Sequence, residues 1–210
     1  MADITIIGYG NMARGIGTRA VAAGKSLQIL GRDADKAAAL AAELGGGTTS
    51  GTTAETPAGD IVVLALWLDA AKEVVAGYGD ALAGKTVVDI SNPVNTETFD
   101  SLVVPADSSA AQEIAKIARG DVVKAFNTTF AGTLVAGQVT GQPLDVFIAG
   151  DSAEAKARVA EFVSAAGLRP LDVGALRHAR ELEGIQLLVM GLSANPATSF
   201  NWDTALKLLQ

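Results

Sequence analysis

The chain has 210 residues, with 23 acidic and 16 basic side chains, a formal net charge of −7, one histidine and no cysteine. This acidic balance disfavours nucleic acid and anionic membranes as partners, and the lack of cysteine and scarcity of histidine argue against disulfides, a thiolate nucleophile and a metal site. The longest uninterrupted apolar run, Ile61–Leu68, is far shorter than the roughly 20 residues of a membrane-spanning helix. A strand-like sequence begins at once in place of a signal peptide, so we expect a cytoplasmic protein without membrane partners.

The first half of the chain alternates short apolar segments with longer amphipathic ones. The segment Ile61–Leu66 is apolar on every side, which is typical of a central parallel strand covered on both faces. Gly24 follows the first amphipathic segment at the usual position for a helix end. These patterns predict strands at residues 4–7, 27–30, 48–53, 61–66 and 86–90, and helices at residues 11–23, 33–44 and 69–78.

The second half of the chain continues the alternation. Asp151 and Glu154 have the spacing of a capping box, which predicts a helix from there to Gly167. A further helix is predicted at residues 109–118, and strands at residues 122–126, 145–149 and 168–173. Near the C-terminus an apolar stripe at helical spacing predicts a last long helix, packed on its own sheet or across a dimer; it comprises Leu176, Ala179, Leu182, Ile185, Val189 and Leu192.

The turn after the first predicted strand carries the strongest chemical signal. Its sequence, Gly8-Tyr9-Gly10-Asn11-Met12-Ala13, fits the pattern G-x-G-x-x-A. Gly8 allows a tight turn, Gly10 lets a pyrophosphate approach the backbone, and the small Ala13 lets the helix pack closely on the strand. The helix start then offers free N–H groups to the phosphates. A structural glycine turn of a flavodoxin-like protein is the alternative, but the strand–turn–helix context favours dinucleotide binding.

Together, the alternation and the glycine turn predict an α/β, Rossmann-type fold with a doubly wound, mostly parallel sheet. We expect residues 1–174 to form this dinucleotide-binding domain. Residues 175–210 are expected to form a short helical extension that completes the substrate site or a dimer interface.

The end of the second predicted strand distinguishes NADP from NAD. An NAD enzyme usually has an acidic residue there for the ribose 2′-hydroxyl, whereas this chain has Gly31 and Arg32. Gly31 leaves room for a 2′-phosphate, Arg32 can bind it with a fork of donors, and Lys36 lies one helical turn further on. In the alternatives, Asp33 caps the next helix while both cations are solvated, or Asp33 reaches the ribose and selects NAD. We expect NADP(H).

Several of these motifs occur together in one known family. The chain resembles the NADP oxidoreductases that use the deazaflavin coenzyme F-420, and the related cytosolic reductase domain of six-transmembrane metalloreductases. The resemblance spans nearly the whole chain and implies hydride transfer between NADPH and a deazaflavin or flavin, usually in a homodimer. Trp67 replaces a common proline, and residues 127–132 differ from the archaeal pattern. The resemblance is carried by Gly10–Met12, Arg32 with Lys36, Val63–Trp67, Ser91–Val94 and Gly167–Leu176.

The loops that follow the parallel strands should form the site, because ligands bind outside the carboxyl ends of such strands. Asn92 and Asn127 could orient a carboxamide or an acceptor carbonyl, or simply bond their own loops. Trp67 could stack on a cofactor ring or pack at the strand end, and Pro93 could be a rigid turn. Hydride transfer between two ring systems requires no general acid or base, so we predict no catalytic side chain. The predicted cofactor-binding residues are Gly8, Tyr9, Gly10, Asn11, Met12, Gly31, Arg32, Lys36, Leu66, Trp67, Asn92, Pro93 and Asn127.

Two further titratable residues have competing interpretations. His178 falls on the polar side of the last helix, which favours a surface or interface residue over a proton donor. Asp89 ends a buried strand and either serves the site or bonds loop amides.

The sequence therefore favours an NADPH-dependent oxidoreductase that acts on a small-molecule redox acceptor, either a deazaflavin or the flavins FMN or FAD. One alternative is a redox-sensing NADP(H)-binding module without turnover. The other is a dehydrogenase of a small carbonyl or imine substrate. Such enzymes usually carry a large helical substrate domain with a lysine or histidine donor, for which about 35 residues leave little room unless a dimer partner completes the site.

Overall fold

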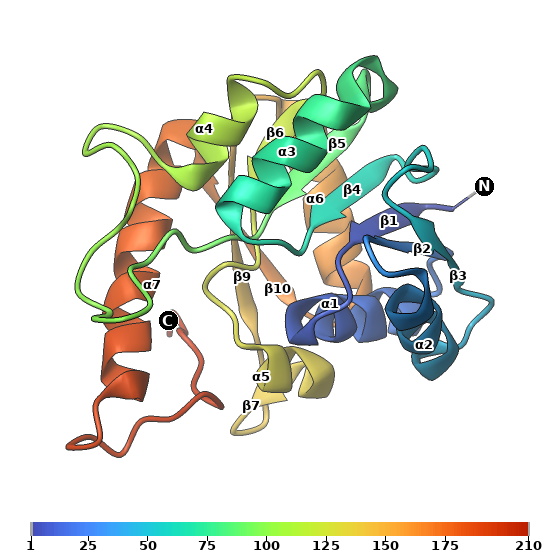
Figure 1. The fold of residues 1–210 in the computed structure, drawn as a ribbon. Coiled ribbons are helices and arrows are strands. Elements are labelled where there is room, and N and C mark those ends of the chain that lie inside the picture. The colour runs from blue at the N-terminus through green and yellow to red at the C-terminus, as the bar shows by residue number, and fades with distance from the viewer. Residues whose placement is uncertain (1, 210) are drawn as a thin grey trace.

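Short runs rich in β-branched residues form one sheet in the computed structural model, which describes residues 2–209 (Figure 1). Over these residues the sheet has eight strands in the order β10-β9-β6-β5-β4-β1-β2-β3. A small hairpin, β7 (Gln138–Val139) with β8 (Gln142–Pro143), lies apart from it. The strands of the large sheet are β1 (Ile4–Ile7), β2 (Leu27–Gly31), β3 (Thr49–Thr52), β4 (Ile61–Leu64), β5 (Thr86–Asp89), β6 (Asp121–Lys124), β9 (Asp145–Gly150) and β10 (Arg169–Gly174).

The six strands from β3 to β6 in this order run parallel, so their carboxyl ends meet at one edge of the sheet. Strand β9 pairs with β6 in the antiparallel direction, and β10 pairs with β9 in parallel. The predicted Rossmann-type, mostly parallel sheet is thereby confirmed, with one reversed pair of strands at its end.

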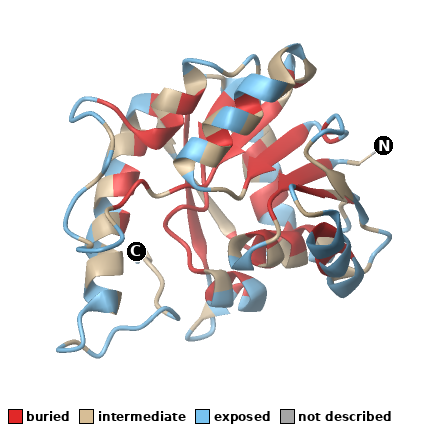
Figure 2. Ribbon diagram, viewed as in Figure 1, coloured by how far each residue is buried: buried red, intermediate tan, exposed pale blue. Residues whose placement is uncertain are grey.

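Helices cover both faces of the sheet. Apolar side chains of α1, α2, α5 and α6 pack on one face, whereas those of α3, α4 and the first turn of α7 pack on the other. Figure 2 shows buried residues concentrated in the strands between these layers. The helices are α1 (Asn11–Ala22), α2 (Ala34–Leu44), α3 (Leu68–Tyr78), α4 (Ala110–Ala115), α5 (Ala131–Ala136), α6 (Ala153–Ala165) and α7 (Ala179–Ala194), with short 3-10 turns at Gly79–Leu82 and Leu176–His178.

The start of α6 corrects one prediction. Ser152, and not Asp151, caps this helix, because its hydroxyl accepts a hydrogen bond of 3.2 Å from the amide of Ala155. The carboxylate of Asp151 instead accepts a bond of 2.9 Å from the amide of Leu176, which fixes the approach to α7. Helix α5 and the hairpin after it were not predicted, and α4 is shorter than expected.

The apolar stripe predicted on the last helix is buried only in its first half. Leu176, Ala179 and Leu182 are buried, but Ile185 is 38% exposed and Leu192 is 42% exposed. Beyond Leu182, the buried positions of α7 hold Glu183 and Gln186. The inner face of this helix is therefore polar where it leaves the sheet, and the physical reason lies in the site described below.

The C-terminal segment after α7 turns back and is held at the reversed end of the sheet (Figure 1). Leu206 packs against the buried cluster of Phe147, Ala149 and Leu182, and Asp145 accepts hydrogen bonds from Lys207 Nζ (2.6 Å) and from the Leu208 amide (2.9 Å). Burial disfavours the charged form of Asp145, but the bonds from Arg169, Lys207 and Leu208 outweigh it and lower the pKa to about 2. Among residues 2–209, no helix combines the length and hydropathy that crossing a membrane requires.

Candidate functional site

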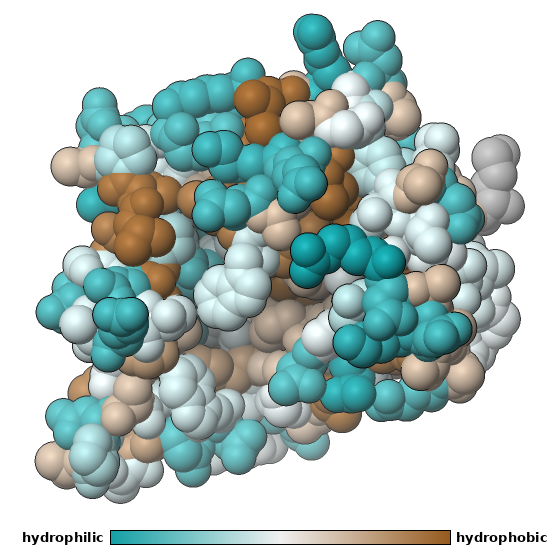
Figure 3. Space-filling view, viewed as in Figure 1, coloured by the Kyte–Doolittle hydropathy of each residue, from teal (hydrophilic) through white to brown (hydrophobic). Residues whose placement is uncertain are grey.

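A cavity of about 890 Å³ opens at the carboxyl ends of the parallel strands. Figure 3 shows this face of the molecule hollowed, with apolar surface inside the hollow. Ten of the thirteen predicted cofactor residues line the cavity, whereas Lys36, Pro93 and Asn127 do not. The ten are Gly8, Tyr9, Gly10, Asn11, Met12, Gly31, Arg32, Leu66, Trp67 and Asn92.

The turn between β1 and α1 has the geometry of an anion cradle. Gly8 has a φ of 121°, and a Cβ there would lie 2.4 Å from the carbonyl oxygen of Ala65, so only glycine fits. A Cβ on Gly10 would meet no atom within 4 Å, so the space beside it is open. Helix α1 begins there with no side-chain cap and no acidic residue in its first turn. Its free N–H groups therefore fit the pyrophosphate of a dinucleotide.

The end of β2 holds one cation on the cavity wall. Arg32 is exposed and lines the cavity. Lys36 does not line the cavity: its Nζ lies 3.4 Å from the carboxylate of Asp33 and 5.8 Å from the ring centroid of Tyr9, which does line it. The carboxylate of Asp33 caps α2 by accepting the Lys36 amide at 3.1 Å, and this bond lowers its pKa. Arg32 is thus the side chain here that fits a 2′-phosphate.

The reason for glycine at position 31 differs from the one expected. A Cβ on Gly31 would lie 2.4 Å from the ring of Tyr9, which fills the space that the sequence suggested for a phosphate. Glycine here leaves room for the Tyr9 ring beside the end of β2, so the space that remains for a 2′-phosphate lies toward Arg32.

The two asparagines of the loops after β5 and β6 bond each other. Asn92 Nδ2 donates to the backbone oxygen of Asn127 at 2.8 Å, and Asn127 Nδ2 donates to Asn92 Oδ1 at 3.0 Å. Asn127 Nδ2 also donates to the backbone oxygen of Leu182 in α7, at 3.1 Å. These side chains therefore tie the two loops to each other and to the C-terminal extension, while Asn92 still borders the cavity.

A buried ion cluster lies directly behind these loops. Lys124 Nζ donates to Asp89 Oδ2 (2.7 Å), Glu183 Oε1 (2.7 Å) and the backbone oxygen of Ser91 (2.6 Å), and all three charged side chains are 0% exposed. Burial alone would lower the pKa of Lys124, but the two carboxylates outweigh it and raise that pKa. Burial raises the pKa of Glu183, whose other oxygen accepts the Ala110 amide at 3.0 Å. The cluster fastens α7 to the sheet, and sequence reasoning missed it.

The signal for this cluster was present but weak. A lysine inside the apolar strand β6 and a glutamate within the apolar stripe of α7 each break the local pattern, but nothing in a single sequence pairs them. For Asp89, the structure shows both a salt bridge and a loop-amide bond of 3.0 Å from Ser91. His178 lies off the cavity, with its Nδ1 2.5 Å from the backbone oxygen of Val173.

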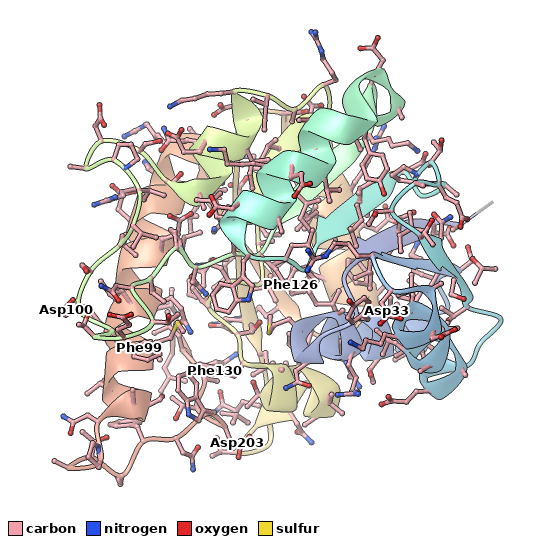
Figure 4. All side chains as sticks on the ribbon, in the orientation of Figure 1. Asp33, Phe99, Asp100, Phe126, Phe130 and Asp203 are labelled. Carbon is pink, nitrogen blue, oxygen red and sulfur yellow. The ribbon has the colours of Figure 1, made fainter. Side chains whose placement is uncertain are left out.

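Aromatic rings enclose the end of the cavity beside the C-terminal segment. Trp202 meets Phe130 edge to face, with centroids 5.6 Å apart, and Phe99 at 6.2 Å. Figure 4 shows Phe99 and Phe130 near the segment that carries Asp203. Trp67 lines the same cavity and is 67% exposed. Such walls suit a planar ring.

Tyr78 of α3 adds a polar group that the sequence did not indicate. It lines the cavity, and its hydroxyl is buried without a hydrogen-bond partner among the described residues. Burial, with the nearby charge of Glu55, raises the pKa of Tyr78 to about 12. The hydroxyl therefore stays protonated and can donate to a bound ligand.

The comparisons with known proteins agree with the resemblance drawn from the sequence. Residues 3–93 match the sequence model of the family "NADP oxidoreductase coenzyme F420-dependent". The chain is 34% identical to Metalloreductase STEAP3 of Rattus norvegicus over 187 residues, which cover 89% of this chain but 37% of that protein. It is 29% identical to the F420-dependent NADP reductase of Methanothermobacter thermautotrophicus, covering 92% of this chain and 89% of that one.

A solved structure agrees in fold over the whole chain. A crystal structure from Arthrobacter sp. FB24, of a protein proposed to be an F420-dependent NADP reductase, superposes with a TM-score of 0.82 at 24% identity. The match covers 98% of this chain and 100% of that one, so it includes the C-terminal extension.

Proposed function

We propose, from the match of residues 3–93 to the family of coenzyme F420-dependent NADP oxidoreductases, that the chain transfers a hydride between NADP(H) and a deazaflavin or flavin. One observation carries the proposal. A single cavity of about 890 Å³ joins the phosphate-binding turn at Gly8–Met12 to the aromatic walls at Phe130 and Trp202. A dinucleotide and a second planar ring would therefore share one enclosed space.

The side chains have distinct tasks in this proposal. The N-terminus of α1 and the open space at Gly10 hold the pyrophosphate, and Arg32 binds the 2′-phosphate. When bound, NADPH supplies the hydride. The bonded pair Asn92 and Asn127 fixes the loops on which the nicotinamide end would rest. Trp67, Phe130 and Trp202 exclude water and keep the two rings in contact.

The carbonyl or imine dehydrogenase is less well supported. Neither lysine nor histidine occurs among the cavity-lining side chains of residues 2–209, so the usual proton donor of such an enzyme is missing from this wall. The redox-sensing module differs from the main proposal only in turnover and is tested by the same experiment.

The C-terminal extension, residues 175–210, has two proposed roles. It supplies Gln186, Met190 and Trp202 to the cavity, which supports its part in the acceptor site. The opposite side of α7 exposes Ile185 and Leu188, 38% and 68% respectively, which supports a homodimer across this helix. Replacing Leu188 by Asp should then convert a dimer to a monomer in analytical ultracentrifugation, and an unchanged mass would contradict that interface.

The test of function is anaerobic mixing of the purified protein with NADPH and an oxidised deazaflavin, with FMN and FAD in parallel. The absorbances of the nicotinamide and the acceptor are followed together. Matched loss of both signals with the deazaflavin identifies a deazaflavin reductase, and turnover with FMN or FAD alone identifies a flavin reductase. NADPH binding without reduction of any acceptor contradicts the proposal and favours the binding module.

A further inference from the structure

One wall of the cavity contains polar atoms that are buried but bond nothing in the described chain. Gln186 is 1% exposed and lines the cavity, and its Oε1 has no hydrogen-bond partner. Ser91, in the loop after β5, also lines the cavity, and its buried hydroxyl has no hydrogen-bond partner among the described residues either. Buried polar groups are nearly always bonded, so unbonded ones on residues that line a cavity point to a ligand or an ordered water as their partner.

The helix that carries Gln186 is held in place one turn before this residue. One turn earlier, Glu183 bonds Lys124 Nζ at 2.7 Å, and the backbone oxygen of Leu182 accepts a bond from Asn127. Rotating this part of α7 to bring Gln186 outward would break the buried ion cluster. The same helix leaves the apolar Leu188 exposed. An amide inside and a leucine outside reverse the usual arrangement, and Oε1 of this amide accepts no hydrogen bond from the described residues.

The surroundings of Gln186 define the ligand that would satisfy it. Met190, Phe130 and Trp202 line the same cavity and offer apolar and aromatic surface. A planar ring with one polar edge fits such walls. A side-chain amide presents one acceptor beside one donor, so its complement is a ring N–H next to a ring carbonyl.

We propose that Gln186 is the specificity-determining residue for the redox acceptor, and that it binds the imide edge of the acceptor ring. Gln186 Oε1 accepts from the ring N3–H, and Gln186 Nε2 donates to a neighbouring ring carbonyl. Deazaflavins and flavins share this pyrimidinedione edge, so the contact explains selection of the ring system and not of one member. The proposal rests on the function proposed above.

The nicotinamide carboxamide presents a similar amide edge, and the experiment distinguishes the two sources. The probes are 5-deazalumiflavin and its N3-methyl derivative, which lacks the N3–H donor. Each is titrated by fluorescence quenching into the NADP-loaded protein. The variants are Gln186→Leu and, as a matched control, Gln142→Leu on the exposed hairpin. Because Oε1 has no partner, Gln186→Leu should fold with a Tm equal to or above that of the wild type.

We expect the wild type and Gln142→Leu to bind the parent ring about 10-fold or more tightly than the N3-methyl ring. Gln186→Leu should lose this preference while its affinity for NADPH changes less than about 2-fold. Equal binding of both rings by the wild type would overturn the inference but leave the proposed function standing. A second result would also overturn the inference: Gln186→Leu binds NADPH more weakly than the wild type does but binds the 3-acetylpyridine analogue of NADPH equally well. That result would assign the contact of Gln186 to the nicotinamide carboxamide. Binding of neither ring would contradict the proposed function itself.

Discussion

Replacing Lys124 by Met should destabilise the fold more than any exposed charge replacement. The substitution removes three hydrogen bonds of 2.6–2.7 Å and leaves Asp89 and Glu183, both 0% exposed, without their cation. Removing one partner of a buried ion pair costs about 3–5 kcal/mol, because the remaining charge is desolvated and unpaired. That is a large part of the roughly 5–15 kcal/mol that stabilises a typical domain.

The assay is urea unfolding at pH 7, followed by far-UV circular dichroism. Lys116→Met is the matched control, since Lys116 is 63% exposed and its bond to Glu113 is a surface pair worth at most about 1 kcal/mol. Adding Glu183→Gln to Lys124→Met removes one unpaired charge and should recover at least about 1 kcal/mol. A cost for Lys124→Met no larger than for Lys116→Met, with no recovery in the double variant, would refute a stabilising role for the cluster.

The glycine turn, the cation and the C-terminal segment yield four more predictions. Gly8→Ala should lose more than about 2 kcal/mol of unfolding free energy, because its φ is 121° and its Cβ would lie 2.4 Å from a carbonyl oxygen. Gly10→Val should keep its Tm and lose NADPH binding in calorimetry, since its side chain enters open space; unchanged affinity would contradict the phosphate site. Arg32→Ala should lower the affinity for NADPH about 10- to 100-fold and change the affinity for NADH little. An equal loss of affinity for both coenzymes would contradict the 2′-phosphate contact. The folded-state pKa of Asp145 is about 2, below its unfolded value of 3.8. Ionised Asp145 therefore adds about 2 kcal/mol to the free energy of unfolding above pH 4, and this contribution is lost as the pH falls toward 2. In urea titrations from pH 4 to pH 2, the unfolding free energy of Asp145→Asn should lack this pH-dependent loss. Identical pH profiles for the wild type and Asp145→Asn would refute the prediction.

The fold was predictable because its signals are local. Short apolar segments predicted the strands, and Gly8 and Gly10 predicted the tight turn between β1 and α1. Ten of the predicted cofactor residues meet in one cavity because parallel strands end at one edge of the sheet. That convergence follows from topology alone.

The rest depended on contacts between distant segments. Lys124 bonds Glu183, which lies 59 residues later in the sequence, and Trp202 of the returning C-terminal segment contacts Phe130. No periodicity encodes such pairs. The predicted burial of the apolar stripe of α7 was wrong after Leu182, because the cavity, and not the sheet, lies beneath that half of the helix. The contact between Gly31 and the Tyr9 ring is another such pair, since residues 9 and 31 meet only through the fold.

Direct hydride transfer is tested most sharply by single turnover with NADPH carrying deuterium at C4 of the nicotinamide, prepared in both stereochemical forms. Each is mixed anaerobically with the protein and an oxidised 5-deazaflavin in ordinary water, and the reduced ring is examined by mass spectrometry. We predict that one form, and only one, delivers its deuterium to the acceptor carbon, and that Gly10→Val delivers none. Reduced acceptor that carries only solvent hydrogen, or no reduced acceptor from either form, would contradict hydride transfer in this cavity.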